Sequence, residues 1–251
     1  MRGKDLETRM RELEWFHSLA VLPGAWSIVR VDGRSFSRFT ERRFDKPFDP
    51  RFSTLMVEAA QALLTELCGR YAYTESDEIS VVLGPEFDLF GREVEKLVSL
   101  SASIATAAFT HAAGEPACFD GRIWMGTGID DVIDYLSWRQ ADASRCALNG
   151  WCYWTLRKEG QSQRQATRAL ERATVSAKNE LLFARDINFN EVPAWQRRGV
   201  GLWWETYDKT GHDPIRGTDV TAARRRVHVE RELPMKDDYR DLVRKLVTCS
   251  G

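Results

Sequence analysis

The alternation of strand-like and helix-like segments between residues 26 and 125 most limits the folds open to this chain. Short runs rich in β-branched and aromatic residues alternate with longer stretches whose apolar residues recur at helical spacing. In chain order these are a strand over 26–31, a helix over 50–68, a hairpin of 71–73 and 79–83, a helix over 93–113 and a strand over 118–125. This β-α-β-β-α-β order predicts an α+β, ferredoxin-like fold, in which an antiparallel sheet carries helices on one face.

Segments outside this core extend the pattern at both ends. Apolar spacing predicts a helix over residues 5–22, and a loop is expected over 40–49. Downstream we expect a mainly helical segment over 130–156, a β-rich tail with a turn at Lys209-Thr210-Gly211, a charged edge strand over 224–229 and a last helix over 237–247. We divide the chain into a first region, 1–136, and a helical and β-rich extension, 137–251, integrated in one unit.

The composition fits a globular protein. A chain of 251 residues that is 43% hydrophobic can bury a core of its own. No segment resembles a signal-peptide core or reaches the roughly 20 apolar residues of a membrane span, so we expect a cytoplasmic protein. The five cysteines have no C-x-x-C spacing, which favours reduced thiols over a metal or redox site.

Charge is unevenly distributed along the chain. The formal net charge is only −1, so a polyanion has to be met by a local patch. Residues 139–178 hold eight basic and three acidic residues with aromatic residues between them. This mixture suits phosphate contact and base stacking, although a solvated helix face over an aromatic core explains it equally well. The candidate RNA contacts are Arg139, Arg145, Arg157, Lys158 and Arg164, with Arg224, Arg225 and Arg226 in the tail.

Two short acidic strings carry the candidate chemistry. Val31-Asp32-Gly33-Arg34-Ser35-Phe36-Ser37 follows one apolar run, and Glu75-Ser76-Asp77-Glu78 precedes another. Carboxylates from adjacent strands can hold two Mg²⁺ ions against phosphate oxygens, and Asp32 and Asp77 are suited to supply them. Gly33 lets the backbone approach closely, and the amides that follow it can form an anion-binding concavity.

Each string also has a simpler explanation. Asp32-Gly33 is a common turn pair, and the second string fits a solvated hairpin tip. The four histidines lack the spacing of a zinc site, and Gly126-x-Gly128 lacks the third glycine of a dinucleotide fingerprint. Taken separately, neither string establishes a metal site.

Five blocks of sequence occur in a familiar order between about residues 25 and 185. They are Val29-Arg30-Val31-Asp32-Gly33-Arg34-Ser35-Phe36, Lys46-Pro47, Glu75-Ser76-Asp77-Glu78, Trp138-Arg139-Gln140-Ala141-Asp142 and Lys178-Asn179-Glu180-Leu181-Leu182-Phe183. Together they resemble the tRNA-His guanylyltransferase family, which extends polynucleotides in the 3′-to-5′ direction on a palm domain like that of ordinary polymerases. The resemblance implies a palm-like catalytic region in 1–136 and RNA contacts in 137–251.

The resemblance also implies roles for particular residues. The metal ligands would be Asp32, the carbonyl of Gly33 and Asp77, with both aspartates catalytic. Arg30 and Glu78 match supporting positions. The nucleotide-binding residues would be Asp32, Gly33, Arg34, Ser35, Phe36, Ser37, Lys46, Ser76, Asp77, Lys178 and Asn179. We expect two Mg²⁺ ions, GTP or another nucleoside triphosphate as substrate, ATP for activation of the 5′ end, and tRNA bound by a homotetrameric dimer of dimers.

Two departures from the family pattern narrow the expected activity. The enzymes specific for tRNA-His have a histidine where Ser37 stands, and they carry His-Ile-Asn-Asn-Leu-Tyr-Asn-Thr where this chain reads Ser144-Arg145-Cys146-Ala147-Leu148-Asn149-Gly150-Trp151. This pattern resembles the guanylyltransferase-like branch, which repairs 5′-truncated tRNAs by template pairing. We therefore expect a template-dependent 3′-5′ nucleotidyltransferase.

Other functions fit parts of the same sequence. One alternative is a dedicated tRNA-His guanylyltransferase. Another, from a different class, is a non-catalytic nucleotide- or RNA-binding protein that kept the fold. A nucleotide cyclase or cyclic-dinucleotide synthase shares the palm but lacks support from the Lys178-Asn179-Glu180 block.

Overall fold

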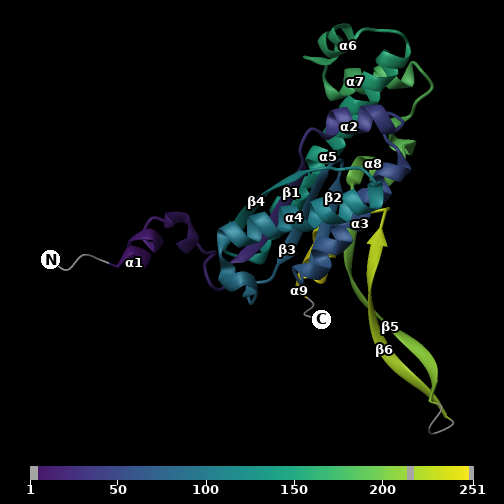
Figure 1. The fold of residues 1–251 in the computed structure, drawn as a ribbon. Coiled ribbons are helices and arrows are strands. Elements are labelled where there is room, and N and C mark those ends of the chain that lie inside the picture. Colours follow the sequence, from purple (N-terminus) through teal and green to yellow (C-terminus); the bar gives the residue numbers. More distant parts are fainter. Residues whose placement is uncertain (1–4, 214–217, 249–251) are drawn as a thin grey trace.

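The computed structural model describes residues 5–213 and 218–248, in which six antiparallel strands form one central sheet (Figure 1). The strands are β1 (Trp26–Gly33), β2 (Tyr71–Glu75), β3 (Glu78–Leu83), β4 (Phe119–Gly126), β5 (Val200–Asp213) and β6 (Thr218–Glu230). Their order in the sheet is β4-β1-β3-β2-β5-β6. The first four strands thus have the arrangement of a β-α-β-β-α-β unit, which confirms the predicted ferredoxin-like fold.

Helices α3 (Pro50–Glu66) and α4 (Val94–Ala113) cover one face of the sheet, as predicted (Figure 1). Side chains alternate along a strand, and those on this face are apolar. Val29 and Val81 of the strands are buried there in one core cluster with Leu63 of α3 and Phe109 of α4.

The opposite face is partly covered by α5 (Ile129–Lys158) and α9 (Lys236–Thr248). Ile28 of β1 packs there with Leu136 of α5 and Val243 of α9. Both helices lie where the sequence predicts them. The helix α5 runs through the division placed after residue 136, and the sheet contains strands from both sides of that division.

A small helical group is built on the second half of α5 (Figure 1). Helices α6 (Gln163–Leu170) and α7 (Val175–Phe183) pack there through a cluster that includes Cys152 and Leu182. The short helix α8 (Ala194–Arg198) then leads into β5. Two short 3₁₀ turns, η2 (Leu89–Arg92) and η3 (Phe189–Glu191), lie elsewhere along the chain.

The N-terminal segment is not the continuous helix predicted over 5–22. It forms the short helix α1 (Leu6–Arg11) and the 3₁₀ turn η1 (Trp15–Ser18), and it projects from the body (Figure 1). Its large apolar side chains are exposed, so no tertiary packing supports a longer helix. The chain then becomes extended, because the Val21 amide donates to the Arg92 carbonyl over 2.9 Å.

Strands β5 and β6 form a long hairpin that projects from the body (Figure 1). The turn predicted at Lys209-Thr210-Gly211 is wrong, because these residues pair in register with residues 220–222 of β6. The connection falls in residues 214–217, outside the described residues, where Pro214 and Gly217 stand in the sequence. Strand β6 is an edge strand of the sheet, as predicted for residues 224–229.

The loop expected over 40–49 begins only at Phe44, because the residues before it form helix α2 (Phe36–Arg43). Phe36 and Thr40 are the buried residues of this helix. The Thr40 hydroxyl donates to the Phe36 carbonyl over 2.8 Å. This bond lets the polar Thr40 side chain lie inside the helix, at the position where the sequence pattern predicts that the loop begins.

Asp49 is the N-cap of α3 and supplies a first prediction. Its Oδ1 accepts from the Arg51 amide over 2.8 Å, and hydrogen bonding from Arg51 lowers the pKa of this buried carboxyl to about 2. Asp49→Ala should lower the free energy of unfolding by about 1–2 kcal/mol. Because the folded pKa lies below the ordinary value of 3.8, this contribution is complete at neutral pH and is lost as the pH falls through the folded value.

Urea denaturation of the wild-type protein and of Asp49→Ala, at pH 7 and at pH 3, measures the loss of unfolding free energy. Asp45→Ala is the matched control, because the exposed Asp45 side chain has only a 4.0 Å ion pair with Arg51. If Asp49→Ala lowered the free energy of unfolding as much at pH 3 as at pH 7, the electrostatic part of the prediction would be contradicted.

Within the described ranges, no helix has the length and apolar character needed to cross a membrane. Cys68, Cys118, Cys146 and Cys152 are free thiols, and Cys249 lies outside the described residues.

Candidate active site

The two acidic strings meet at one end of the sheet. Asp32 lies near the end of β1, opposite Glu78 of β3. Asp77 occupies the two-residue turn between β2 and β3. The Gly33 amide donates to the Asp77 carbonyl over 3.0 Å. This bond holds the end of β1 against the turn, so two carboxylates that are distant in the sequence share one sheet end.

Gly33 permits this arrangement for a packing reason. A Cβ atom at position 33 would lie 2.4 Å from the ring of Phe36. That ring is buried and lies 5.0 Å from the rings of both Phe109 and Phe119, centroid to centroid. It therefore has no room to move, and a side chain at position 33 would disrupt the core directly beside Asp32.

Burial and the charge of a neighbouring carboxylate raise the pKa of both aspartates. For Asp77 the main cause is burial, followed by the charge of Asp32. For Asp32 the main cause is also burial, followed by the charge of Asp120. Asp120 lies opposite Asp32 in β4 and was missed in the sequence. The signal was present, because Asp120-Gly121 repeats the Asp-Gly pair of the neighbouring strand.

The available donors fit Mg²⁺. Carboxylate oxygens of Asp32 and Asp77 and the carbonyl oxygen of Gly33 are the hard ligands that this ion prefers, and a cation would relieve the repulsion between the carboxylates. Among residues 5–213 and 218–248, no group of three or more His, Cys, Asp or Glu side chains is placed to hold a metal ion. A Mg²⁺ ion at this sheet end would complete its coordination with water and substrate phosphate.

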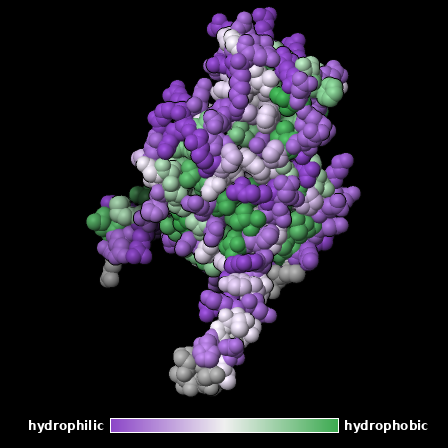
Figure 2. All heavy atoms as spheres, turned by 90° about the vertical axis from the view of Figure 1, so that its right-hand side faces the viewer, coloured by the Kyte–Doolittle hydropathy of each residue, from purple (hydrophilic) through white to green (hydrophobic). Residues whose placement is uncertain are grey.

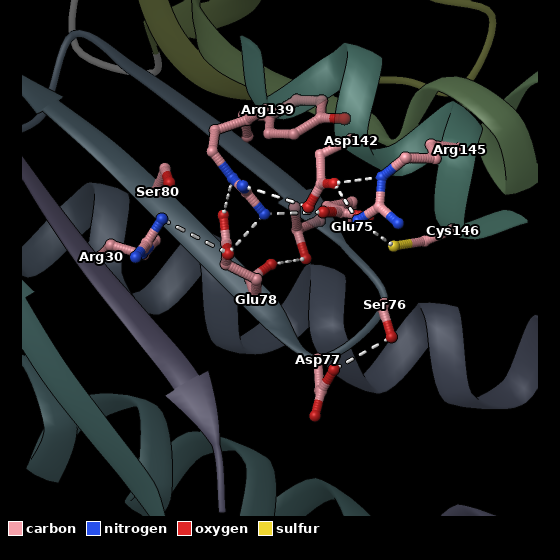
Figure 3. Close-up of polar contacts among 12 residues, drawn as sticks. Arg30, Glu75, Ser76, Asp77, Glu78, Ser80, Arg139, Asp142, Arg145 and Cys146 are labelled. Atoms are coloured by element: carbon pink, nitrogen blue, oxygen red, sulfur yellow. Dashed lines mark hydrogen bonds and ion pairs between the residues drawn. The ribbon is translucent and has the colours of Figure 1, made fainter. Parts of the chain in front are cut away.

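A buried ion cluster supports the turn that carries Asp77 (Figure 3). The Arg139 guanidinium of α5 contacts Glu78 over 2.7 Å, Glu75 over 3.1 Å and Asp142 over 3.2 Å. Glu75 and Glu78 flank the turn, so Arg139 fixes both of its ends, while Asp77 points away from the cluster (Figure 3). Burial, and then the charge of Glu78, raise the pKa of Glu75 to about 8.

Arg139, predicted to contact RNA, faces the interior in this structure. Its residue surface is only 7% exposed, and three carboxylates occupy its guanidinium. Arg30 and Glu78, predicted as supporting residues, do adjoin the site: Arg30 Nη1 lies 3.8 Å from Glu78 Oε2. A basic residue within a basic segment has turned inward, and composition alone cannot distinguish it from its exposed neighbours.

A cavity of about 410 Å³ opens beside the turn, between α2, α3 and α5. Its polar lining includes Ser37, Lys46, Ser76 and Asp77. Its aromatic lining is Phe36, Phe44, Phe48, Phe52, Tyr153, Trp154 and Trp195. The cavity thus combines stacking surfaces with a lysine and one of the two candidate metal ligands. Trp195 has no counterpart in the sequence motifs and was not predicted.

Lys46, which the sequence predicts to bind nucleotide, lines this cavity. Its Nζ donates to the Thr40 hydroxyl over 2.5 Å, and it lies 5.7 Å from the ring centroid of Trp154. Burial lowers the pKa of Lys46, while the charges of Glu41 and Asp77 raise it. A half-buried cation beside Asp77 is placed to meet a phosphate group.

The predicted phosphate-binding segment, residues 34–37, leads into α2. Ser35 is the N-cap with φ 63°, and the first-turn amides of Phe36 and Ser37 have no acceptor within the helix. The Arg34 amide is not available as predicted, because it donates to the Cys118 carbonyl over 2.8 Å. The Phe36 side chain belongs to the core, so any phosphate contact there is through the backbone.

The structure does not bring Lys178 and Asn179 to the aspartates. Both lie on α7 and neither lines the cavity. Lys178 Nζ donates to Asn149 Oδ1 over 2.9 Å, and Asn179 Nδ2 donates to the Val175 carbonyl over 2.9 Å. In this structure they stabilise the packing and helicity of α7.

The other residues of α5 and α6 that are predicted to contact RNA differ in how exposed and how paired their side chains are. Arg145 is exposed but paired with Asp142 over 2.5 Å. Arg157 is partly buried, and its Nε has no hydrogen-bond partner among the described residues. Lys158 and Arg164 are exposed, which leaves them free to meet a phosphate.

The three arginines of β6 are exposed on the projecting hairpin. Arg225 lies over the Trp204 ring at 4.9 Å from its centroid, and Arg226 is paired with Glu205. Arg224 has the least constrained guanidinium, since the described residues provide it with no ion pair.

Paired carboxylates at neighbouring strand ends of a ferredoxin-like sheet, beside a nucleotide-sized cavity, define a palm-type nucleotidyltransferase. The family model described as tRNAHis guanylyltransferase matches residues 7–126, and that of the Thg1 C-terminal domain matches residues 130–244. The chain belongs to the tRNA(His) guanylyltransferase family and is a nucleotidyltransferase. It is 34% identical over 227 residues to a protein of Dictyostelium discoideum named probable tRNA(His) guanylyltransferase, covering 84% of this chain and 86% of the relative.

Further relatives agree with this assignment. The tRNA(His) guanylyltransferase of Neurospora crassa is 36% identical over 195 residues, covering 72% of this chain and 67% of that protein. A bacterial Thg1-like protein in complex with ATP superposes with a TM-score of 0.78 at 27% identity, covering 97% of this chain and 99% of that one. The tRNA(His) guanylyltransferase of Saccharomyces cerevisiae gives a TM-score of 0.70 at 28% identity, covering 76% of this chain and 90% of that one.

Proposed function

We propose that this enzyme adds nucleotides to the 5′ end of truncated tRNA, selecting each one by pairing with the opposite strand. The observation that carries the proposal is the meeting of Asp32 and Asp77 at one end of the sheet, where Asp77 also lines the 410 Å³ cavity. Family membership supports growth in the 3′-to-5′ direction. Ser37 and the sequence of residues 144–151 support repair over the fixed addition of one guanosine.

In the proposed reaction the activated phosphate belongs to the RNA. The 3′-hydroxyl of the incoming nucleotide attacks the α-phosphate of the RNA 5′ end. A new phosphorus–oxygen bond forms, the hydroxyl proton is released, and the bond to the leaving group breaks. Pyrophosphate leaves from a triphosphorylated end, and AMP leaves from an adenylylated one. Two bound Mg²⁺ ions would stabilise the charge that develops on the attacking and leaving oxygens.

The chain's own groups bind and orient the reactants. Asp32, Asp77 and the Gly33 carbonyl hold hard cations, while Lys46 and the first amides of α2 offset phosphate charge. Structures of bacterial Thg1-like proteins are in complex with ATP and with GTP, which supports a purine nucleoside triphosphate as the occupant of the cavity. A volume of about 410 Å³ lies within the range of roughly 300–1,000 Å³ typical of small-molecule sites.

The tRNA partner needs backbone contacts more than base-specific ones, because template pairing selects the nucleotide. Lys158, Arg164 and Arg224 are the exposed cations best placed for that role in the proposal. A cytoplasmic dimer of dimers remains part of the proposal, and sedimentation at working concentration tests the assembly.

The proposal is tested by offering the protein 5′-truncated, triphosphorylated tRNAs with each nucleoside triphosphate in turn. We expect addition to follow the template base and to stop at full length. Guanosine addition regardless of the template would favour a dedicated tRNA-His enzyme. Nucleotide binding without addition to any RNA would favour a non-catalytic protein, and a cyclic product from GTP alone would favour a cyclase.

Lys46 offers a test of the nucleotide position. Lys46→Met should weaken Mg²⁺-GTP binding about 10- to 100-fold, the equivalent of one charge-assisted hydrogen bond. Isothermal titration calorimetry measures the change, and Lys158→Met, which removes an exposed lysine outside the cavity, is the matched control. Unchanged affinity in Lys46→Met would place the phosphates elsewhere.

A further inference from the structure

Trp138 is exposed beside Arg30 of β1, although indole rings normally pack in the interior or at interfaces. It is 55% exposed and lies on α5 directly before Arg139. Two neighbours contact its ring. Tyr135 packs against it edge-on at 5.7 Å between centroids, and the Arg139 guanidinium lies 4.7 Å from its centroid. The indole is therefore fixed in position, while much of its surface faces solvent.

Strands β1 and β4 carry a pair of arginines and a pair of aspartates on one face of the sheet. Antiparallel register partners point to the same face of a sheet. Arg30 and Arg122 are partners, and so are Asp32 and Asp120. Arg30 lies 5.9 Å from the Trp138 ring centroid. The Arg122 side chain is 55% exposed and pairs with Asp120 over 3.3 Å. An aromatic platform thus adjoins the Arg30 guanidinium, and Arg122, Asp32 and Asp120 lie on the same face of the sheet as Arg30.

We propose that Trp138 stacks on the terminal base of the RNA 5′ end and thereby positions that end at Asp32 and Asp77. The inference rests on the proposed function, which requires two reactants at one pair of carboxylates. None of Trp138, Arg30 and Arg122 lines the cavity assigned to the nucleoside triphosphate. The second reactant needs its own surface, and an exposed indole beside an arginine suits a base with its attached phosphate.

The test is a comparison of Trp138→Ala and Trp138→Phe with the wild-type protein. Stacking of one base corresponds to roughly a 5- to 150-fold effect on affinity. Trp138→Ala should therefore raise the KM for truncated, triphosphorylated tRNA at least about fivefold, with the KM for GTP unchanged. Trp138→Phe keeps a π face and should recover most of the affinity. Thermal denaturation confirms that each variant is folded.

A binding measurement without nucleotide gives a readout independent of turnover. Stacked bases quench indole fluorescence, so RNA should quench the wild-type protein more than Trp138→Phe. The matched control is Trp15→Phe, which removes a 75% exposed tryptophan from the projecting N-terminal segment and should leave the quench at the RNA-binding site intact.

The outcomes separate this inference from the proposed function. Equal quench in wild-type and Trp138→Phe proteins, with unchanged RNA affinity in Trp138→Ala, overturns the inference. A rise in the KM for GTP alone also overturns it, because Trp138 would then contact the incoming nucleotide. If the wild-type protein shows the Trp138-dependent quench but adds no nucleotide to any RNA, the proposed function fails while the stacking role stands.

Discussion

Asp77→Asn is expected to slow nucleotide addition about a thousandfold or more. The amide removes one negative charge and one carboxylate ligand from the pair formed with Asp32. A loss of about 4 kcal/mol of charge stabilisation in the transition state corresponds to this factor. Single-turnover addition to a truncated tRNA, with saturating GTP and Mg²⁺, measures the chemical step directly.

A matched control separates the loss of a ligand from the loss of a charge. Asp88→Asn removes an exposed carboxylate from the loop after β3, outside the cavity, and should leave the rate within about twofold of wild type. A rate for Asp77→Asn above one tenth of wild type would be incompatible with the two-metal assignment.

Stability measurements should show that the same substitution does not act through unfolding. Burial and the charge of Asp32 raise the pKa of Asp77, so ionisation of Asp77 destabilises the metal-free fold as the pH rises above the ordinary value of 3.8. Asparagine does not ionise. With a chelator at pH 7, Asp77→Asn should therefore be at least as stable as wild type, and added Mg²⁺ should stabilise only the wild-type protein.

The sequence predicts the part of this site that depends on local patterns. The ferredoxin-like order follows from periodicity, and the turn at Ser76 and Asp77 follows from the apolar runs on either side of it. The meeting of Asp32 with Asp77 then follows from the fold, because β1 lies next to β3 in such a sheet. Asp120 could not be placed in the same way, since its position opposite Asp32 depends on the register of β4.

The errors arise where tertiary contacts decide the local structure. The segment over 5–22 has helical periodicity but no surface to pack against, so only short helical turns form. The strand pairing of Lys209 to Gly211 overrides a turn-like sequence, because the partner strand continues past it. Arg139 lies in a basic segment, yet the direction of its side chain depends on which glutamates the β2–β3 turn presents.

Arg139→Ala is expected to cost about 3–5 kcal/mol of unfolding free energy at neutral pH. The reason is not the energy of the ion pairs themselves but the negative charge of buried Glu78, which loses the guanidinium that compensates it. Guanidinium denaturation measures the loss. Arg145→Ala is the matched control, because its exposed pair with Asp142 should contribute less than about 1 kcal/mol.

The pH dependence identifies the cause of this cost. The pKa of Glu75 is already raised to about 8, and removal of Arg139 should raise it further and raise that of Glu78 as well. Acids with raised folded pKa values destabilise the fold as the pH rises, so Arg139→Ala should lose more at pH 8 than at pH 5. Adding Glu75→Gln and Glu78→Gln to Arg139→Met should restore most of the stability, because neither position then carries a buried negative charge. A loss that is independent of pH and not rescued by these substitutions would instead indicate a packing role for Arg139.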